Sequence, residues 1–313
     1  MRATACTLFE GDYHYGVGAL LNSLYLHGYR GTFWIGWRGG DLPFWARAAS
    51  PGVHGLEFSP AAGLTLCFCR ENPGCHLSHH KPELMLRVLQ EYDTEAAAVY
   101  YFDPDIVIHR SWDFFENWIR FGIPLCEDLT NIGASHPLRL QWKSHARSRG
   151  YTSFRDLDFY LNSGFIGIKR EDAGFLSLWE KLIFLIQEQH PDREHLSYGD
   201  RTNPFQMADQ DALNVALMIS DCALSAAGPD GMSFKTGKPM MFHAIGMPKP
   251  WEIRYALYCL QGKAPTRAQG SYWQHVCTPV RLYPRWKMLL KKADLFLARL
   301  IARIFRHRPP NNL

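Results

Sequence analysis

The chain has 313 residues, of which 47% are apolar and 20% are charged. This is enough length and hydrophobicity for one large domain or two small ones, and it excludes a disordered, collagen-like or coiled-coil protein. The net charge is only +4, but residues 281–313 carry nine basic residues and one acid. The tail is therefore strongly positive, while the rest of the chain is slightly negative.

The sequence favours a cytoplasmic protein with free thiols. We find no apolar run of the roughly 18 to 20 residues that a membrane-spanning helix needs, and no apolar stretch of signal-peptide length at the N-terminus. The eight cysteines are spread along the chain, unlike those of a disulfide scaffold. Cys67, Cys69, Cys75 and His76 could bind zinc, but Cys-x-Cys is not the usual spacing of a zinc site, so buried or unreactive thiols are the favoured interpretation.

Strand-like and helical segments alternate through the first half of the chain. This alternation predicts an α/β fold with a mainly parallel central sheet. The segment at 96–108 should be a buried strand that is interrupted at Pro104 and continues as a second extended piece. We expect the strands at 3–9, 31–37 and 96–108, and the helices at 15–26 and 84–89.

After residue 110 the periodicity weakens. Residues 128–150 and 191–204 are polar and contain Gly, Pro or Ser. This composition predicts long ordered loops attached to the sheet, where binding sites are common.

The last segment predicts an amphipathic helix over residues 285–308, outside a main domain of residues 1–260. Met288, Leu295 and Phe305 interrupt its pattern. Because nearly every charge is positive, we expect residues 281–308 to contact an anionic membrane surface; packing on the chain's own domain and nucleic-acid contact are the alternatives. We assign residues 261–313 to a C-terminal tail that contains this helix. The apolar arc consists of Trp286, Leu289, Leu290, Ala293, Phe296, Leu297, Leu300, Ile301 and Ile304, and the opposite face of Lys287, Lys291, Lys292, Arg299, Arg303 and Arg306.

The most specific local signal is Asp103-Pro104-Asp105, directly after an apolar run. In extended chain the two acids project from the same side, about 7 Å apart. They lie where a parallel strand ends, and open α/β folds bind ligands at that edge. Two carboxylates there suit Mg²⁺ or Mn²⁺ holding a diphosphate. The alternative is a solvated strand end.

A second segment, Met241 to Trp251, places an imidazole, a glycine and a lysine on a predicted loop. His243 can supply one nitrogen to a metal ion. Gly246 allows close backbone approach, and Lys249 is a point charge for a phosphate. Each of these residues also has an ordinary structural explanation.

Two further segments carry polar groups inside apolar surroundings. Asn162 and Ser163 should lie at a turn within Phe159 to Ile168. Asp209 and Gln210 should open a helix, where they could serve partly as N-terminal caps.

Taken together, these motifs resemble the A-type glycosyltransferases of family eight, the group of glycogenin and the bacterial lipooligosaccharide galactosyltransferases. The resemblance runs from about residue 5 to 251 and implies a single GT-A type nucleotide-diphospho-sugar transferase domain. Some family members that act on lipid-linked glycans also have a basic, aromatic C-terminal tail. The motifs are Asp12-Tyr13 with Ser23, FDPD, LNSGF, DQDALN and HAIGMPKPW.

The resemblance implies roles for individual residues. Asp103, Asp105 and His243 would hold Mn²⁺ or Mg²⁺ on the diphosphate of a UDP-sugar. The donor-binding residues would be Asp12 and Tyr13 at the uracil, Lys249 at a phosphate, and Phe102 and Gly246 beside them. Asn162, Asp209 and Gln210 would form the catalytic sugar pocket, with Gln210 nearest the anomeric carbon.

Two departures mark the chain as a divergent relative. The family's usual Arg-Leu pair before the metal motif is replaced by His79-His80-Lys81-Pro82, so Lys81 is the candidate substitute. Pro104 stands where a small residue is more usual.

The expected function is metal-dependent sugar transfer from a nucleotide-sugar to a glycan or lipid-linked acceptor, with retention. The protein would act on the inner face of the cytoplasmic membrane in cell-surface polysaccharide synthesis, and nucleic acid is not an expected partner. Three other hypotheses remain: a binding module that has lost turnover, a haloacid-dehalogenase-type phosphatase, and a nucleotidyltransferase. The phosphatase would need its Asp-x-Asp on the first strand, and the nucleotidyltransferase a basic Gly-rich loop after that strand.

Overall fold

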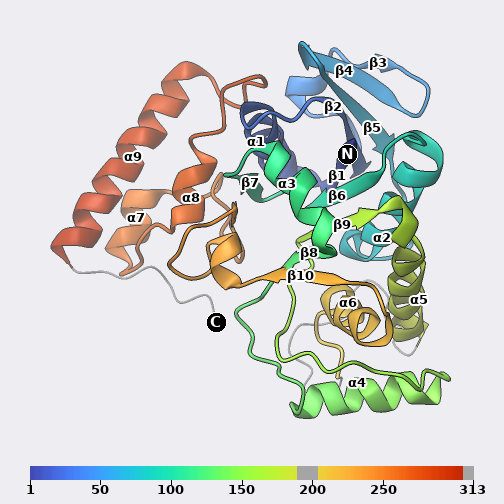
Figure 1. Cartoon of the computed structure of the whole chain (residues 1–313). Helices are drawn as coiled ribbons and strands as arrows, with labels where there is room; N and C mark the ends of the chain where they lie inside the picture. The colour runs from blue at the N-terminus through green and yellow to red at the C-terminus, as the bar shows by residue number, and fades with distance from the viewer. Residues whose placement is uncertain (189–203, 306–313) are drawn as a thin grey trace.

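The computed structural model describes residues 1–188 and 204–305. Its centre is a seven-stranded sheet in the order β3-β4-β5-β2-β1-β6-β9 (Figure 1). The four middle strands are parallel, and β4 and β9 on either side run antiparallel to them. The edge strand β3 pairs antiparallel with β4. The predicted α/β class with a mainly parallel sheet is confirmed. The strands are β1 (Ala3–Glu10), β2 (Gly31–Arg38), β3 (Ser50–Pro51), β4 (Leu56–Ala61), β5 (Leu64–Arg70), β6 (Ala98–Phe102) and β9 (Phe165–Lys169).

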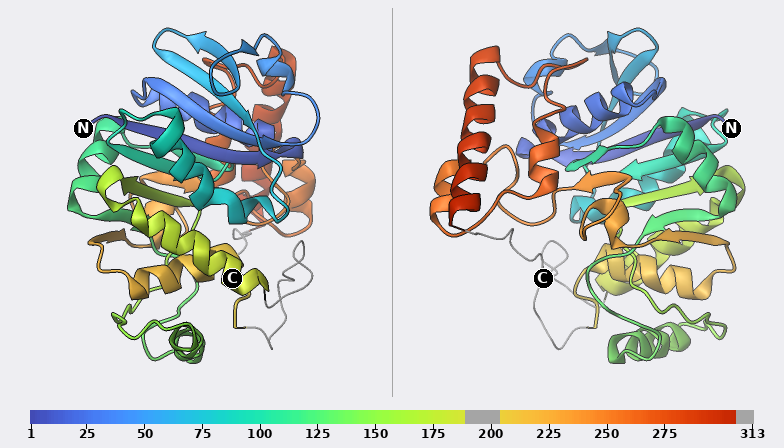
Figure 2. Two further views of the ribbon diagram at one scale, coloured as in Figure 1. Left: turned by 90° about the vertical axis from the view of Figure 1, so that its right-hand side faces the viewer. Right: turned by 60° about the vertical axis from the view of Figure 1, so that its left-hand side comes forward.

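Side chains alternate between two hydrophobic cores, one on each face of this sheet. On β1 and β2, Ala5 and Phe33 belong to one core, whereas Cys6 and Trp34 belong to the other. A strand that is buried on both faces has a continuous apolar sequence, because neither face is in contact with water. Helices α1 (His14–Leu26) and α3 (Trp112–Trp118) pack in the first core, and α2 (Lys81–Arg87), α5 (Gly174–Glu188) and α6 (Ala208–Ile219) in the second (Figures 1 and 2).

Two small sheets extend this framework. Strand β8 (Ile123–Cys126) pairs in parallel with β10 (Leu224–Ala227). Strand β7 (Ile106–Ile108) pairs antiparallel with β11 (Met241–His243). The interruption predicted at Pro104 therefore separates β6 from β7, and the second piece leaves the main sheet to pair with a segment over 130 residues away in the sequence.

The prediction of loops over residues 128–150 is partly wrong, because helix α4 spans Pro137–Ser148. Proline occupies its first turn, and the His136 imidazole accepts a hydrogen bond from the Leu138 amide. Trp142 and Ala146 are buried one helical turn apart, so the helix packs through a narrow stripe that a mostly polar sequence conceals. The segment predicted as a loop at 191–204 lies outside the described residues, apart from Pro204.

The C-terminal region continues the first core. Asn22 of α1 donates to the carbonyls of His275 and Val280, and Tyr15 stacks on Tyr283. The boundary predicted after residue 260 thus falls inside a shared core. The helices are α7 (Tyr255–Leu260), α8 (Arg267–Tyr272) and α9 (Arg285–Ile304). In the part of the chain that the structure describes, no helix is both long and apolar enough to cross a membrane.

Candidate active site

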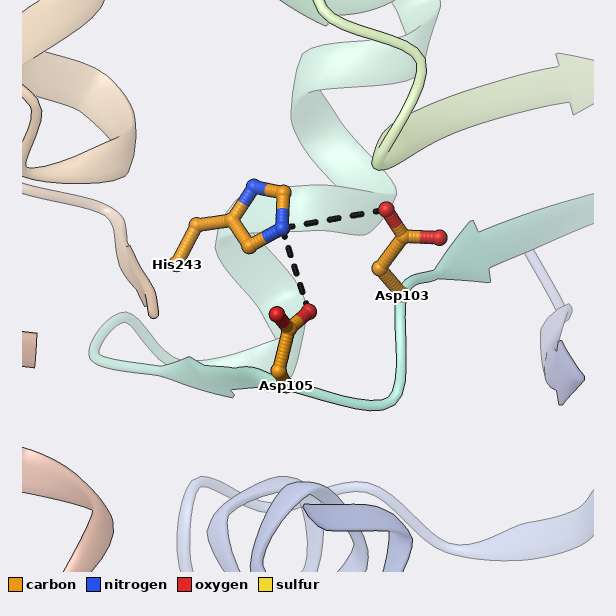
Figure 3. A group of neighbouring side chains, drawn as sticks. All are labelled: Asp103, Asp105 and His243. Atoms are coloured by element: carbon orange, nitrogen blue, oxygen red, sulfur yellow. Dashed lines mark ion pairs between the residues drawn. The ribbon is translucent and has the colours of Figure 1, made fainter. Parts of the chain in front are cut away.

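The three predicted metal ligands meet beyond the end of β6 (Figure 3). The Nε2 atom of His243 lies 3.1 Å from Oδ1 of Asp105 and 3.7 Å from Oδ2 of Asp103. One donor atom from each residue lies within 4.8 Å of the other two. Adjacent ligands of a Mg²⁺-sized ion are about 3 Å apart, so the group can close on such an ion with little movement. Two carboxylates and an imidazole form a donor set that also suits Mn²⁺.

Backbone pairing brings these side chains together. The Asp103 amide donates to the Gly164 carbonyl at 2.7 Å, which joins the end of β6 to the start of β9. The β7–β11 pairing sets His243 opposite Ile106, next to Asp105, and the Ala244 amide donates to the Asp105 carbonyl. The Asp-Pro-Asp turn thereby receives a ligand from a distant part of the sequence.

Lys249 lies against the second carboxylate of this group. Its Nζ is 2.6 Å from Oδ2 of Asp105 and 3.1 Å from the Ala244 carbonyl oxygen. Burial would raise the pKa of Asp105, but the neighbouring Lys249 and His243 hold it well below its usual range. For Lys249, burial lowers the pKa and the Asp105 carboxylate more than reverses this effect. Both groups are therefore charged at neutral pH.

Lys81 links the metal-binding carboxylates to the predicted sugar pocket. Its buried Nζ lies 3.0 Å from Oδ1 of Asp103 and 3.0 Å from Oδ2 of Asp209, and it also donates to Ser163. Burial alone would lower the pKa of Lys81, but Asp103 and Asp209 together raise it above its usual value. Burial would likewise raise the pKa of Asp209, which Lys81 instead lowers. Lys81 is therefore positively charged at neutral pH and lies between two acids.

The residues predicted to surround the sugar form one hydrogen-bonded network. Gln210 accepts from the Ser163 amide through Oε1 and donates through Nε2 to Asp128 at 3.3 Å. Asn162 donates to the same Asp128 oxygen at 2.7 Å. Asp209 accepts from the Ser163 hydroxyl. The capping role suggested for Asp209 and Gln210 is wrong, because both side chains point to the turn at Asn162 and Ser163.

Asp211, rather than Asp209 or Gln210, binds the backbone at the start of helix α6. Its Oδ2 accepts from the Met207 amide, immediately before α6, and its Oδ1 accepts from the Tyr160 hydroxyl. Burial raises the pKa of Asp211 to about 7. The carboxylate fixes the start of the helix that presents Asp209 and Gln210.

The predicted nucleotide-binding residues lie near the end of β1. Asp12 is exposed, and Tyr13 is half-buried with its ring edge-on to Trp251 at 5.5 Å between centroids. Lys249 Nζ lies 5.5 Å from the centre of the Tyr13 ring, which connects this end to the metal group. Gly246 has a positive φ of 77°, a conformation that favours glycine.

Phe102 requires a correction. Its side chain is completely buried among core aromatics, including Phe165 at 5.2 Å, so its ring has no surface for a nucleotide. Its carbonyl accepts a hydrogen bond from Thr7. The phenyl group of the FDPD motif therefore supports the strand end rather than the donor.

Sequence reasoning missed two kinds of residue here. Asp128 holds both sugar-pocket amides but lies in a segment without a recognisable motif. Gly164 is needed for space: a Cβ atom on it would lie 2.5 Å from His243 Cε1 and 2.7 Å from Oδ2 of Asp103. The glycine of LNSGF was the available signal, since glycine is favoured where other groups approach the backbone closely.

The cysteines do not assemble into a metal site with His76. Cys67 and Cys69 lie side by side on β5 with their sulfurs 4.0 Å apart. Among the described residues, the group at Asp103 is the one set of three or more possible ligands in mutual reach. Cys67 and Cys69 are buried in the second core, in agreement with the interpretation as buried thiols.

Comparison with known proteins identifies the fold. The sequence matches no known family profile and no curated protein. The apo structure of WbbM, a bifunctional glycosyltransferase, superposes with a TM-score of 0.54 at 12% identity, covering 93% of this chain and 51% of WbbM. The chain has the same fold as this structure. This confirms the architecture that the sequence resemblance implies.

Two other glycosyltransferase structures agree. The glycosyltransferase GlyE of Streptococcus pneumoniae TIGR4 gives a TM-score of 0.51 at 16% identity, covering 100% of this chain and 65% of GlyE. An active-site mutant of LgtC gives a TM-score of 0.52 at 14% identity, covering 91% of this chain and 99% of LgtC. The chain thus spans about half of the WbbM structure and about two thirds of GlyE. Within this fold the Asp-Pro-Asp turn follows β6, which contradicts the first-strand position required by the phosphatase hypothesis.

Proposed function

We propose that the chain is a metal-dependent glycosyltransferase that moves a sugar from a UDP-sugar to a glycan or lipid-linked acceptor with retention of configuration. The observation that carries the proposal is the Asp103–Asp105–His243 group, flanked by the two buried lysines Lys81 and Lys249. This arrangement suits a donor with a diphosphate, because the acids can hold a divalent cation while the ammonium groups neutralise the remaining oxygens.

The metal-binding residues fit Mn²⁺ or Mg²⁺ by their donor atoms and spacing. When bound, such an ion supplies electrostatic stabilisation of the negative charge that develops on the leaving diphosphate. Lys249 is held by Asp105 and the Ala244 carbonyl within reach of the same phosphates. Its ammonium therefore adds a second positive charge at a fixed position, without reorganisation during the reaction.

The nucleoside would bind at the Tyr13 end of the site. The Tyr13 ring lies beside Trp251 and Lys249, and Asp12 is exposed next to it. An aromatic face and a free carboxylate are suited to stacking a pyrimidine and accepting its N–H group. Gly246 leaves the backbone open to close approach by a phosphate, since no atom lies within 4 Å of its Cβ position.

The sugar would bind beside Asn162, Asp209 and Gln210. The amide of Gln210 is oriented at both ends, by the Ser163 amide and by Asp128. A neutral, hydrogen-bonded amide is a poor nucleophile but a good partner for a sugar hydroxyl. Retention itself rests on the family resemblance; given retention, the poor nucleophilicity of Gln210 favours front-face attack with the leaving phosphate as the base. A covalent glycosyl adduct on Gln210 or Asp209, trapped and detected by intact-protein mass spectrometry, would contradict that course.

A thermal-shift panel tests the function as a whole. Nucleotides and nucleotide-sugars are tested with and without Mn²⁺ on the wild type, on Asp105→Ala and on the surface control Asp156→Ala. A ligand at 100 times its Kd adds about 2.7 kcal/mol to the free energy of unfolding. We expect such a shift with one UDP-sugar only when metal is present, in the wild type and in the control. Release of UDP in the presence of acceptor then establishes transfer. A shift without UDP release would indicate a binding module, and no shift with any nucleotide would contradict the proposal.

A further inference from the structure

Helix α9 has two apolar faces, and only one of them is used inside the protein. The inner face packs on α7 at the edge of the molecule (Figures 1 and 2). Leu295 and Ala298 are buried there, and Met288, Ile301 and Ala302 are partly buried. Met288 and Leu295, which interrupt the pattern seen in the sequence, are thus residues that attach the helix to its domain.

The outer face is the apolar arc predicted from the sequence, and it is exposed. Leu289 is 67% exposed, and Leu297 is 51% exposed, against 6% for Leu295 on the inner face. Single exposed apolar residues are ordinary, whereas a continuous row on one helix face marks an interaction surface. We call this set the outer face: Trp286, Leu289, Leu290, Ala293, Phe296, Leu297, Leu300 and Ile304.

The charges of α9 divide between the same two faces. Asp294, the single acid of the tail, accepts hydrogen bonds from the first two amides of α7, at Tyr255 and Ala256. Lys291 turns inward with it and donates to the Ile253 carbonyl. Within the described residues, the one ion pair formed by α9 joins Lys291 to Asp294 at 3.7 Å.

One edge of the outer face is entirely basic. On a helical projection, the angular positions of Arg285, Lys292, Arg299 and Arg303 fall within about 40° of one another, immediately beside Phe296. All four residues are exposed, although the guanidinium of Arg299 reaches back beside Gly270 of α8. With the tail's acid used internally, the surface that α9 offers consists of apolar side chains bordered by positive charge.

We propose that the outer face of α9 lies on an anionic lipid bilayer, with its apolar side chains at the headgroup boundary and the basic edge on lipid phosphates. An anionic bilayer accounts for both the exposed apolar row and the basic edge of α9. Because the cytoplasmic leaflet is negatively charged, the proposal places the chain on the inner face of the cytoplasmic membrane. A nucleic acid would neutralise the charges but leave the leucines in water. A second copy would bring like charge to the contact. The inference concerns location and is independent of the donor and of the metal site.

Removal of the whole helix is a poor test, because Leu295 and Ala298 belong to the core. Point substitutions on the outer face avoid this problem. The full chain is mixed with sucrose-loaded vesicles of phosphatidylcholine alone, or with 30% phosphatidylglycerol, at low and at high salt, and the bound fraction is measured after sedimentation.

The charge variant is Lys292→Gln/Arg299→Gln/Arg303→Gln. Each basic residue near an anionic surface contributes about 1 kcal/mol, or roughly a fivefold change in partition, so the triple variant should bind on the order of 100-fold more weakly. Its matched control, Arg120→Gln/Arg149→Gln/Lys181→Gln, removes three exposed charges from elsewhere on the surface and should bind as the wild type does.

The apolar variant is Leu290→Ser/Leu297→Ser, and its control is Phe121→Ser/Leu140→Ser, two exposed apolar residues away from α9. We expect at least a tenfold loss of binding for the first and none for the second. The metal-dependent UDP thermal shift should be unchanged in all four variants, which separates this test from that of the proposed function.

Four results would overturn the proposal. The first is wild-type chain that stays in the supernatant with anionic vesicles at low salt. The second is equal binding by the charge variant and its control. The third is a dimer, seen by analytical ultracentrifugation, that the apolar variant dissociates. The fourth is tight binding of nucleic acid that the charge variant abolishes while vesicle binding persists.

Discussion

The metal-binding end of the sheet and helix α9 handle charge in opposite ways. Around Asp103 the charges are buried or partly buried, alternate in sign and are paired: Lys81 lies between Asp103 and Asp209, and Lys249 lies on Asp105. On α9 the outward charges are exposed and of one sign. Buried pairs of this kind hold a site in shape for a small charged ligand, whereas a one-sign surface needs a partner that the protein itself does not supply.

The largest expected effect is at Lys81. Lys81→Met leaves the partly buried carboxylates of Asp103 and Asp209 without their buried cation, and removal of one partner from a buried pair costs up to about 3–5 kcal/mol. Urea unfolding should show this loss. The double variant Lys81→Met/Asp209→Asn should recover part of it, since it removes one of the stranded charges. Equal stability of wild type and Lys81→Met would show that the pairing has no structural value. Lys292→Met on α9 is the matched control and should change stability by less than about 0.5 kcal/mol.

A second contrast lies within α9 itself. Leu295→Ala on the inner face should destabilise the protein by about 2–5 kcal/mol, as for other buried leucines, whereas Leu297→Ala on the outer face should have little effect. Denaturant unfolding of the two variants in parallel measures this difference. Equal losses would mean that both faces are packed in solution.

The metal-binding end should also be the acid-sensitive part. Burial lowers the pKa of His79 to about 4, with Asp209 opposing this effect and His76 and Lys81 adding to it. Gln187 lies 2.6 Å from its Nδ1. Between pH 6.5 and 4 the unfolded chain binds a proton here that the folded chain does not. The free energy of unfolding therefore falls as the pH falls through this window, by up to about 3 kcal/mol. The variant His79→Gln should flatten this part of the pH profile, and an unchanged slope would contradict the assignment.

The smallest expected effect comes from a comparison of two glycines, Gly164 beside the predicted metal ligands and Gly40 on the surface. In Gly164→Ala the new methyl group would meet His243, Asp103 and Asn162 at 2.5–2.8 Å, so we expect a loss of about 1–3 kcal/mol and weaker Mn²⁺ binding. Gly40→Ala, with no atom within 4 Å of its Cβ position, should be neutral in both respects. Isothermal titration with Mn²⁺ measures the second effect. Equal Mn²⁺ affinity in the two variants would show that the ligands can move apart at no cost.

The sequence predicted those parts of the molecule that local pattern controls. The alternating elements gave the parallel sheet, and the interruption at Pro104 marked where β6 ends and the metal-binding turn begins. Asp128 could not be predicted, because its role depends on amides that reach it from two other segments. The ring of Phe102 was misassigned, since a motif letter does not reveal which face of a strand end it occupies.

The orientation of helix α9 on the protein could not be predicted from the sequence either. Its periodicity predicted an apolar arc but not whether that arc packs inward or faces water. The arc faces water because Met288 and Leu295, on the other side of the helix, make the contacts with the protein. Tertiary packing of this kind is not encoded in the spacing of one helix alone.

The link between α9 and α7 also fixes geometry over a distance. Asp294 caps α7 and Lys291 binds the Ile253 carbonyl, four residues beyond Lys249. These contacts attach α9 to the segment that follows Lys249, the lysine that faces Asp105. Once α9 rests on a bilayer, the sugar-transfer centre would stand at a set height and angle above the lipid, and its acceptors would be sorted by reach: a glycan too short or too long to present its hydroxyl at that height would escape modification whatever its chemistry.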